Sequence, residues 1–117
     1  MSNYPAYRVA AAHVAPVFLD RTATAEKVCA VIEEAARGGA QLVAFPETYI
    51  PAFPVWCSVR APIHNHDFFR RLAASTVLVP GPELTRIAST ARRGCSCRSA
   101  STKGRKRAWA VSGTPMC

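Results

Sequence analysis

One stretch of the sequence limits the fold more than any other, the run LVAFPETYIPAFPVW at Leu42–Trp56. Its first residues are apolar and typical of a buried strand, whereas the following prolines and aromatic side chains are typical of a stiff loop. Its one carboxylate, Glu47, stands where the strand pattern gives way to the loop pattern. Such a junction suits a catalytic group, because the strand fixes the acid and the loop shapes a pocket beside it. The simpler alternative is an acid that caps a turn.

The residues before Glu47 predict a strand–helix–strand unit. Tyr7–Ala15 is an apolar run predicted to be a buried strand, Thr22–Arg37 a helix, and Gln41–Phe45 a second strand. Because the connections are short and a helix lies between the strands, we expect the strands to be parallel neighbours. Functional groups in such sheets collect beyond the carboxyl ends of the strands, which is where Glu47 falls. The sequence therefore predicts an α/β fold with Glu47 at its functional edge.

The predicted helix Thr22–Arg37 has one apolar face and clear end signals. Thr22 or Thr24 can cap its start, and Gly38-Gly39 supplies a left-handed stop. Cys29 lies on the apolar face, so we expect it to act as a small buried hydrophobe rather than as a reactive thiol. The residues that form this face at three- and four-residue spacing are Ala25, Val28, Cys29, Val31, Ile32, Ala35 and Ala36.

Two further helices are predicted after the proline-rich loop. The first is Phe68–Thr76, with Asn65 or Asp67 as its cap, and the second is Glu83–Arg93, which follows the turn signal Pro80-Gly81-Pro82. The residues of the first helix expected to pack inward are Phe68, Phe69, Leu72 and Ala73.

Three features resemble metal or nucleophile sites but lack the supporting residues. His64-Asn65-His66 has no partner cluster and is better explained as a helix start. Cys57 has only Arg60 as a nearby positive charge, which argues against a tuned nucleophile. The pair Cys95-x-Cys97 has neither the usual ligand spacing nor a second pair. We therefore expect no metal ion and no cofactor.

The net charge of +8 is unevenly distributed. Residues 1–93 carry ten Lys/Arg and seven Asp/Glu, whereas residues 94–117 carry five Lys/Arg and no acid. The second segment has neither helical nor strand periodicity, so it is predicted to be a basic, disordered tail. A basic tail can contact nucleic acid or an acidic partner, which gives one interpretation of this segment.

A shift of reading frame is the interpretation that we favour for residues 94–117. Codons that encode this segment can be chosen so that the same bases, read from the third position, give LLVSIGVNEGTKARVGCLWNTNV. That amino-acid sequence begins with an apolar, β-branched run typical of a strand, and a strand is what the preceding pattern of strands and helices predicts next. We therefore divide the chain into residues 1–93, part of a folded domain, and residues 94–117, a frameshifted tail, and expect no nucleic-acid partner.

Composition sets the remaining expectations. Half of the residues are apolar, which is enough for a core in one small domain or a piece of a larger one. The sequence contains neither a run of about 18 apolar residues nor a secretory signal at its start, so we expect no membrane contact and a cytoplasmic location.

The segment AFPETYIPAFPVW, the opening YRVAAAHVAPVFLD and the run GGAQLVAFPE together resemble the nitrilase, or carbon–nitrogen hydrolase, superfamily. The continuation of the FPE motif to IPAFPVW resembles the nitrilase branch, and the resemblance covers residues 7–93. It implies the N-terminal part of a nitrilase-type α-β-β-α sandwich, incomplete in this chain. The frame-shifted text LLVSIGVNEGTK also resembles the strand that the family places next.

The resemblance implies a function and a set of site residues. Glu47 corresponds to the general base of a Glu–Lys–Cys triad that converts a small-molecule nitrile to a carboxylic acid and ammonia through a cysteine thioimidate. Tyr49, Phe53 and Trp56 are expected to surround this acid and to bind substrate. The full-length form is expected to be a homo-oligomer.

The family's lysine, and its cysteine in a Cys-Trp-Glu context, match no residue of this sequence. We therefore expect this chain to be inactive alone, because two of the three catalytic groups are missing. The alternative is a non-catalytic binding or interaction fragment with a nucleic-acid-binding basic tail.

Overall fold

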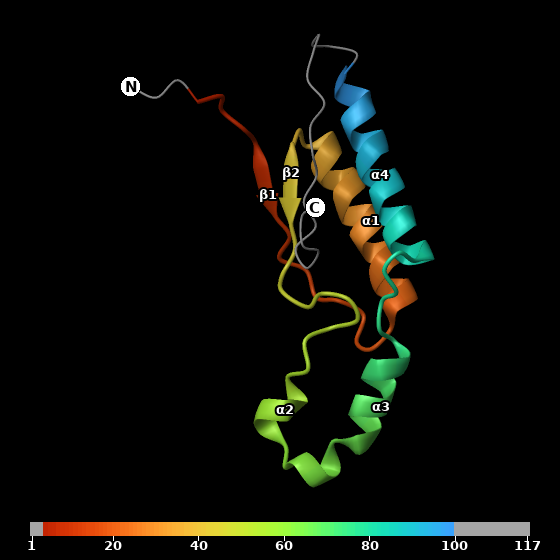
Figure 1. Cartoon of the computed structure of the whole chain (residues 1–117). Helices are drawn as coiled ribbons and strands as arrows, with labels where there is room; N and C mark the ends of the chain where they lie inside the picture. The colour runs from red at the N-terminus through yellow and green to blue at the C-terminus, as the bar shows by residue number, and fades with distance from the viewer. Residues whose placement is uncertain (1–3, 100–117) are drawn as a thin grey trace.

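The structure is a computed structural model that describes the backbone of residues 4–99 and the side chains of residues 4–94. A small sheet stands beside two long helices, and a lobe of shorter helices, residues 56–74, extends from one end of this unit (Figure 1). The elements in chain order are β1 (Val9–Ala11), α1 (Arg21–Arg37), β2 (Leu42–Ala44), α2 (Trp56–Val59), the 3₁₀ turn Pro62–His64, α3 (His66–Ala74) and α4 (Pro82–Ser99).

The two strands are parallel neighbours, as the strand–helix–strand pattern predicts. Ala10 of β1 stands opposite Val43 of β2. Two hydrogen bonds extend the pairing past both ends of the assigned strands, from Gln41 N to Arg8 O at 2.7 Å and from Ala12 N to Ala44 O at 2.8 Å. Both assigned strands are three residues long, shorter than the predicted ranges.

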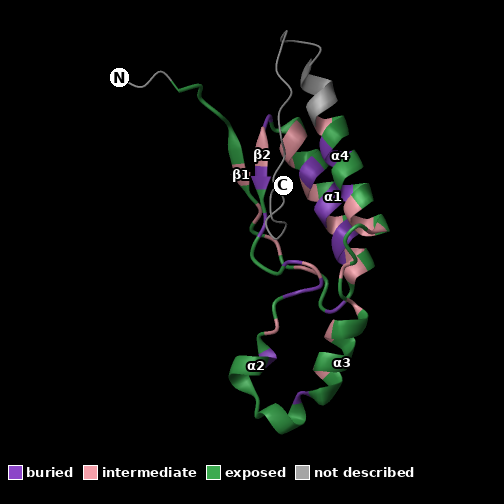
Figure 2. Ribbon diagram, in the orientation of Figure 1, coloured by how far each residue is buried: buried purple, intermediate pink, exposed green. Residues whose placement is uncertain are grey.

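The core lies between the sheet and the two long helices. Helices α1 and α4 run side by side, and their buried residues face each other and β2 (Figure 2). Val28 of α1, Val43 of β2 and Ile87 of α4 are each at most 5% exposed. The buried residues of this core are Ala25, Val28, Cys29, Ile32, Ala40, Val43, Phe45, Tyr49, Ile87 and Ala91. The predicted burial of Cys29 is confirmed.

The strand β1 is not buried on both faces, which corrects the expectation for Tyr7–Ala15. Ala10, Ala12 and Val14 are partly buried against the core, whereas the alternate residue Val9 is 62% exposed. Successive side chains of a strand point to opposite faces, and within the described residues helices cover only one face of this sheet. The apolar run therefore predicted the strand but not which face is covered.

The start of α1 is capped by Asp20, and neither Thr22 nor Thr24 serves as the cap. Asp20 Oδ1 accepts a hydrogen bond of 2.9 Å from Ala23 N, which satisfies one of the free amides of the first turn. Thr24 is fully buried instead, and its hydroxyl both accepts from Val17 N and donates to Val17 O. It therefore fixes the segment that leads into the helix.

The end of α1 is the predicted glycine stop. Gly39 has a φ of 93°, which glycine adopts without steric cost. Gly39 N donates to Ala36 O and Ala40 N to Ala35 O, the paired hydrogen bonds of a Schellman motif. The chain then reaches β2 within two residues.

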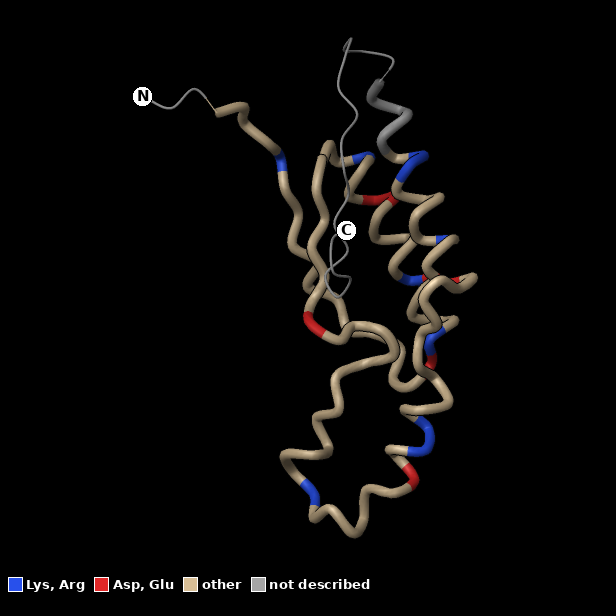
Figure 3. The backbone as a smooth tube through the Cα atoms, in the orientation of Figure 1, with Lys and Arg blue, Asp and Glu red and all other residues tan. Residues whose placement is uncertain are grey.

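Ion pairs link α1 to α4 along their exposed sides, where charges of both signs alternate (Figure 3). They join Arg21 to Glu83 at 3.1 Å, Glu26 to Arg86 at 3.0 Å, and Glu33 to Arg93 at 3.7 Å. The Glu26 and Glu33 pairs are exposed, and such pairs contribute roughly 0–1 kcal/mol each. The Glu83 carboxylate is only 11% exposed, so the pair with Arg21 is the least accessible to solvent of the three.

The helix α3 lies in the lobe and is less buried than predicted. Asn65 occupies its cap position, but its side chain makes no capping hydrogen bond. Phe68 and Leu72 are partly buried, whereas Phe69 and Ala73 are exposed, so only half of the predicted inward face packs.

The helix α4 begins one residue before the predicted range Glu83–Arg93 and continues to Ser99. Residues 94–99 of the predicted disordered tail therefore belong to this helix, which corrects the prediction for them, and residues 100–117 lie outside the described residues. None of the helices within residues 4–99 has the combination of length and apolarity that crossing a membrane requires.

We predict that Asp20→Ala lowers the free energy of unfolding by about 1 kcal/mol, because the amide of Ala23 loses its acceptor. The matched control is Thr22→Ala, at the exposed position that the sequence also offered as a cap. Urea unfolding followed by helical circular dichroism measures both. Equal losses in the two variants would contradict the assignment of Asp20 as the cap.

Candidate active site at the end of β2

Glu47 lies just beyond the carboxyl end of β2, at the start of a turn that runs through residues 47–51. Its side chain is exposed, and within the described residues its carboxylate makes no hydrogen bond or ion pair. The position matches the sequence prediction, and a carboxylate without a partner is available to accept a proton.

Two aromatic residues anchor the turn on either side of Glu47. Phe45 and Tyr49 are both buried, and their ring centroids are 5.3 Å apart. The Tyr49 hydroxyl donates a hydrogen bond of 3.2 Å to the carbonyl oxygen of Ala15, in the segment that follows β1. Glu47 is thus held on a short turn whose two ends are packed into the core.

The backbone between these anchors is strained at Thr48, which has a φ of 50°. A β-branched residue in the left-handed region costs roughly 1–2 kcal/mol, so the surrounding contacts have to hold it there. Such strained residues concentrate at functional sites, where they set the direction of a neighbouring group. At this turn Glu47, before Thr48, is exposed, whereas Tyr49, after it, is buried.

Trp56 belongs to a second aromatic cluster in the lobe. Its ring stacks on Phe68 at a centroid distance of 5.2 Å and meets Phe18 edge-on at 5.6 Å. The guanidinium of Arg60 lies 5.2 Å from the centroid of Phe68. Trp56 is buried, and its indole Nε1 has no hydrogen-bond partner within the described residues.

The three aromatic residues predicted to bind substrate lie in three different settings, of which the one nearest in sequence to Glu47 is Tyr49 in the same turn. Tyr49 packs against Phe45, Trp56 packs in the lobe, and Phe53 is 51% exposed on the loop between them. Of the three, Phe53 presents the largest free aromatic surface. Their contact with substrate stays a prediction.

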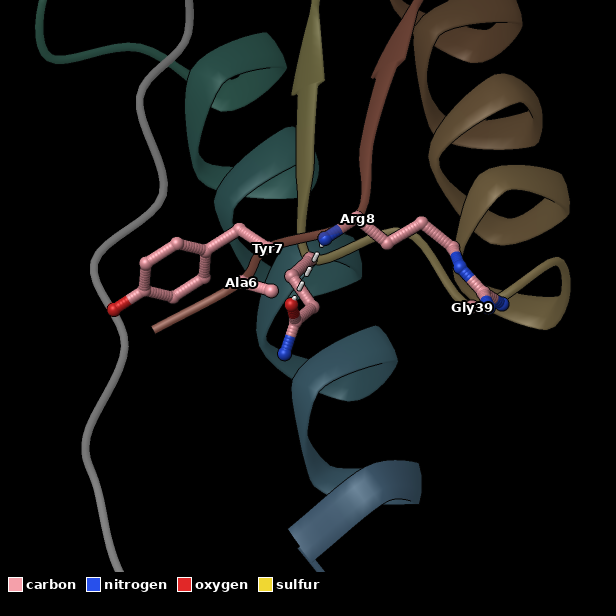
Figure 4. Close-up of a pocket in the computed structure, with 5 residues that line it drawn as sticks. Ala6, Tyr7, Arg8 and Gly39 are labelled. Carbon is pink, nitrogen blue, oxygen red and sulfur yellow. Dashed lines mark hydrogen bonds between the residues drawn. The ribbon is translucent and has the colours of Figure 1, made fainter. Parts of the chain in front are cut away.

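A pocket among the described residues lies at the amino ends of β1 and β2, whereas Glu47 lies at the carboxyl end of β2. It is lined by Ala6, Tyr7, Arg8, Gly39 and Gln41, which precede β1 and β2 (Figure 4). Arg8 N donates to Gln41 Oε1 at 3.1 Å, and the guanidinium of Arg8 donates to the carbonyl oxygen of Gly38. These contacts close the end of α1, so the hollow has a structural explanation and no connection to the acid.

No group of three or more His, Cys, Asp or Glu side chains that could hold a metal ion occurs among the described residues. Cys57 is exposed on α2 and Cys29 is buried in the core. His64 and His66 are both exposed in the lobe, on either side of the buried Asn65.

Sequence reasoning missed two features near the site. The carbonyl oxygen of Ala15 accepts the hydrogen bond of the Tyr49 hydroxyl. Because it belongs to the backbone, nothing in the sequence indicates its role. Phe18 contacts both Trp56 and Phe68. No sequence signal pointed to Phe18, because its partners lie about 40 and 50 residues further along the chain.

Comparison with known proteins gives a family match over most of the chain. The sequence model of the carbon–nitrogen hydrolase family matches residues 8–100. Three relatives illustrate the similarity. A nitrilase of Bacillus sp. (strain OxB-1) is 39% identical over 89 residues, which is 76% of this chain and 26% of the relative.

An arylacetonitrilase of Aspergillus oryzae is 43% identical over 84 residues, which is 72% of this chain and 25% of the relative. A bifunctional nitrilase/nitrile hydratase of Nicotiana tabacum is 37% identical over 95 residues, which is 77% of this chain and 27% of the relative. The chain thus spans about a quarter of the length of these relatives.

Burial raises the pKa of the Tyr49 phenol above its ordinary value of 10.0, because charge is disfavoured away from water. The fold therefore favours the neutral phenol, so this contribution to stability is intact below pH ~10 and is lost as the pH rises above it. We predict that Tyr49→Phe makes stability less sensitive to pH above that value. Urea unfolding at a series of alkaline pH values, with Tyr4→Phe as the exposed control, measures this. Parallel alkaline declines in the wild type and Tyr49→Phe would contradict it.

Proposed function

The chain belongs to the carbon–nitrogen hydrolase family, and we propose that it carries the general base, Glu47, of a nitrile-hydrolysing enzyme. One observation carries the proposal: the acid of the FPE motif stands at the carboxyl end of β2, exposed and without a described partner. In parallel sheets this edge is where reacting groups gather. The names of the relatives, nitrilase and arylacetonitrilase, support a nitrile as the substrate class.

In the proposed reaction, Glu47 accepts the proton of a cysteine thiol while the sulfur attacks the nitrile carbon. The nitrile nitrogen takes up a proton, and the product is a covalent thioimidate. Water activated by the same carboxylate then adds to the thioimidate carbon, ammonia leaves, and a thioester remains. A second water hydrolyses the thioester to the carboxylic acid and frees the thiol. A lysine stabilises the charge that develops on the reacting nitrogen and oxygen.

We propose that the lysine and the cysteine come from sequence beyond the 117 residues of this chain. None of its five cysteines is followed by Trp-Glu. Cys29 is also buried and packed in the core, which excludes it as the attacking thiol in this fold. The chain is thus expected to give no nitrile turnover alone, and assembly of the full-length form as a homo-oligomer stays a prediction.

A hybrid enzyme tests the role of Glu47. Residues 8–93 of this chain replace the matching segment of the Bacillus sp. nitrilase, so that the relative supplies the rest of the protein. We predict that this hybrid hydrolyses nitriles and that Glu47→Gln lowers kcat by at least about 100-fold, because the amide cannot accept the thiol proton. Ammonia release measures turnover, and circular dichroism confirms that the variant is folded.

The matched control is Glu34→Gln, which neutralises another exposed glutamate with no described side-chain partner. It is expected to keep the turnover of the unsubstituted hybrid. Substantial turnover by a folded Glu47→Gln hybrid would show that another group takes the proton and would overturn the proposal.

The gene sequence tests where the remaining residues lie. We propose that residues 94–117, which hold five Lys/Arg and no acid, arise from a shifted reading frame. A one-base correction near the codon for Gly94 is expected to open a frame that encodes an apolar strand and, further on, a cysteine followed by Trp-Glu. Stop codons throughout that frame would sink this interpretation.

A further inference from the structure

Among the described residues, the turn that carries Glu47 is hydrogen-bonded to the segment between β1 and α1. Three hydrogen bonds make the connection: Ala12 N to Ala44 O at 2.8 Å, the Tyr49 hydroxyl to Ala15 O at 3.2 Å, and Leu19 N to Pro51 O at 3.1 Å. Two of them join backbone to backbone, one before the turn and one at its last residue, Pro51. The third bond uses the Tyr49 hydroxyl. In both segments its partners, Tyr49 and Ala15, lie in sequence between the residues that make the two backbone bonds.

The surroundings of Tyr49 show what this bond fixes. Its ring is 6% exposed and lies against Phe45, so the side chain is directed into the core. Thr48, which has a φ of 50°, lies between Tyr49 and Glu47 in the chain. Glu47 itself is exposed. A backbone rotation at Thr48 that moved the ring out of the core would therefore also change the direction of the Glu47 Cα–Cβ bond relative to the core.

We propose that Tyr49 is a positioning residue for Glu47, and that its buried hydroxyl holds the strained turn in the one orientation that directs the carboxylate to the reaction site. This inference rests on the proposed function of Glu47. Proton transfer requires heavy atoms within about 3 Å, and a displacement of about 1 Å can cost a factor of 100 in rate. A turn with a β-branched residue in the left-handed region needs such a tether, because its relaxation would move the acid.

The same contacts argue against direct action by Tyr49 on substrate. Its hydroxyl proton is already donated to the carbonyl of Ala15, and almost none of its surface is accessible. Burial also raises the pKa of the phenol, so the hydroxyl stays a donor throughout the neutral range. We accordingly reassign Tyr49 from the predicted substrate-binding set to the support of the acid.

The first test uses the full 117-residue chain and needs no activity. Tyr49→Phe keeps the ring and removes only the hydroxyl, and Tyr4→Phe makes the same change at a residue that is 83% exposed. Losing a bond worth roughly 1 kcal/mol is expected to speed hydrogen exchange of the Leu19 amide about fivefold. Residual dipolar couplings of Glu47 are expected to shrink, while those of Val28 in α1 stay unchanged. Unchanged Leu19 exchange and Glu47 couplings in Tyr49→Phe would overturn the inference.

The second test uses the hybrid enzyme and separates positioning from general stability. Tyr49→Phe is expected to lower kcat about tenfold with KM unchanged, because substrate contacts are not altered. In the Glu47→Gln background the same change is expected to have no further effect, since there is no base left to position. A full additional loss in the double variant would indicate a structural role and would contradict the inference.

The outcomes distinguish this inference from the proposed function. If Glu47→Gln abolishes turnover but Tyr49→Phe leaves kcat intact, Glu47 remains the base and the positioning role fails. If Glu47→Gln leaves turnover intact, the proposed function itself fails, whatever Tyr49→Phe does to the exchange of Leu19.

Discussion

The parallel pairing of β1 with β2 is the constraint on which the rest of the described structure depends. Parallel strands cannot be joined by a tight turn, so the chain has to cross over between them, and α1 is that crossover. The crossover buries Val28 and Ile32 against Val43, and α4 completes the same core with Ile87. Because both strands run in one direction, both also end at one edge, which places Glu47 beside the segment that leaves β1.

The position of Glu47 follows from that edge together with two kinds of anchoring. Buried rings before and after the acid hold the ends of its turn, and hydrogen bonds tie the turn to the segment after β1. The strain at Thr48 is tolerated because these contacts fix both sides of it. In the lobe, by contrast, Val59 is 78% exposed and Ile63 is 73% exposed, so few contacts other than the Trp56 cluster define that region.

The sequence predicted the parts of this structure that depend on periodicity and turn chemistry. The strand–helix–strand order, the glycine stop of α1 and the place of Glu47 all follow from residue pattern. The cap was missed because Asp20, Thr22 and Thr24 have similar capping chemistry, and only the backbone path decides which one is used. The contact between Tyr49 and Ala15 was missed because a carbonyl acceptor 34 residues away leaves no trace in side-chain identity. Burial of Trp56 and exposure of Phe69 likewise depend on tertiary contacts.

The central proposal is that this fold presents Glu47 to the thiol of a cysteine supplied by a longer chain. A crystal structure of the hybrid enzyme tests it most directly, through the distance between the Glu47 carboxylate and the Sγ atom of the attacking cysteine proposed to lie in the part that the relative supplies. We predict a separation of about 3 Å, or a single bridging water, because proton transfer needs that reach. A carboxylate that points to bulk solvent, with Sγ beyond the reach of one water, would contradict the account.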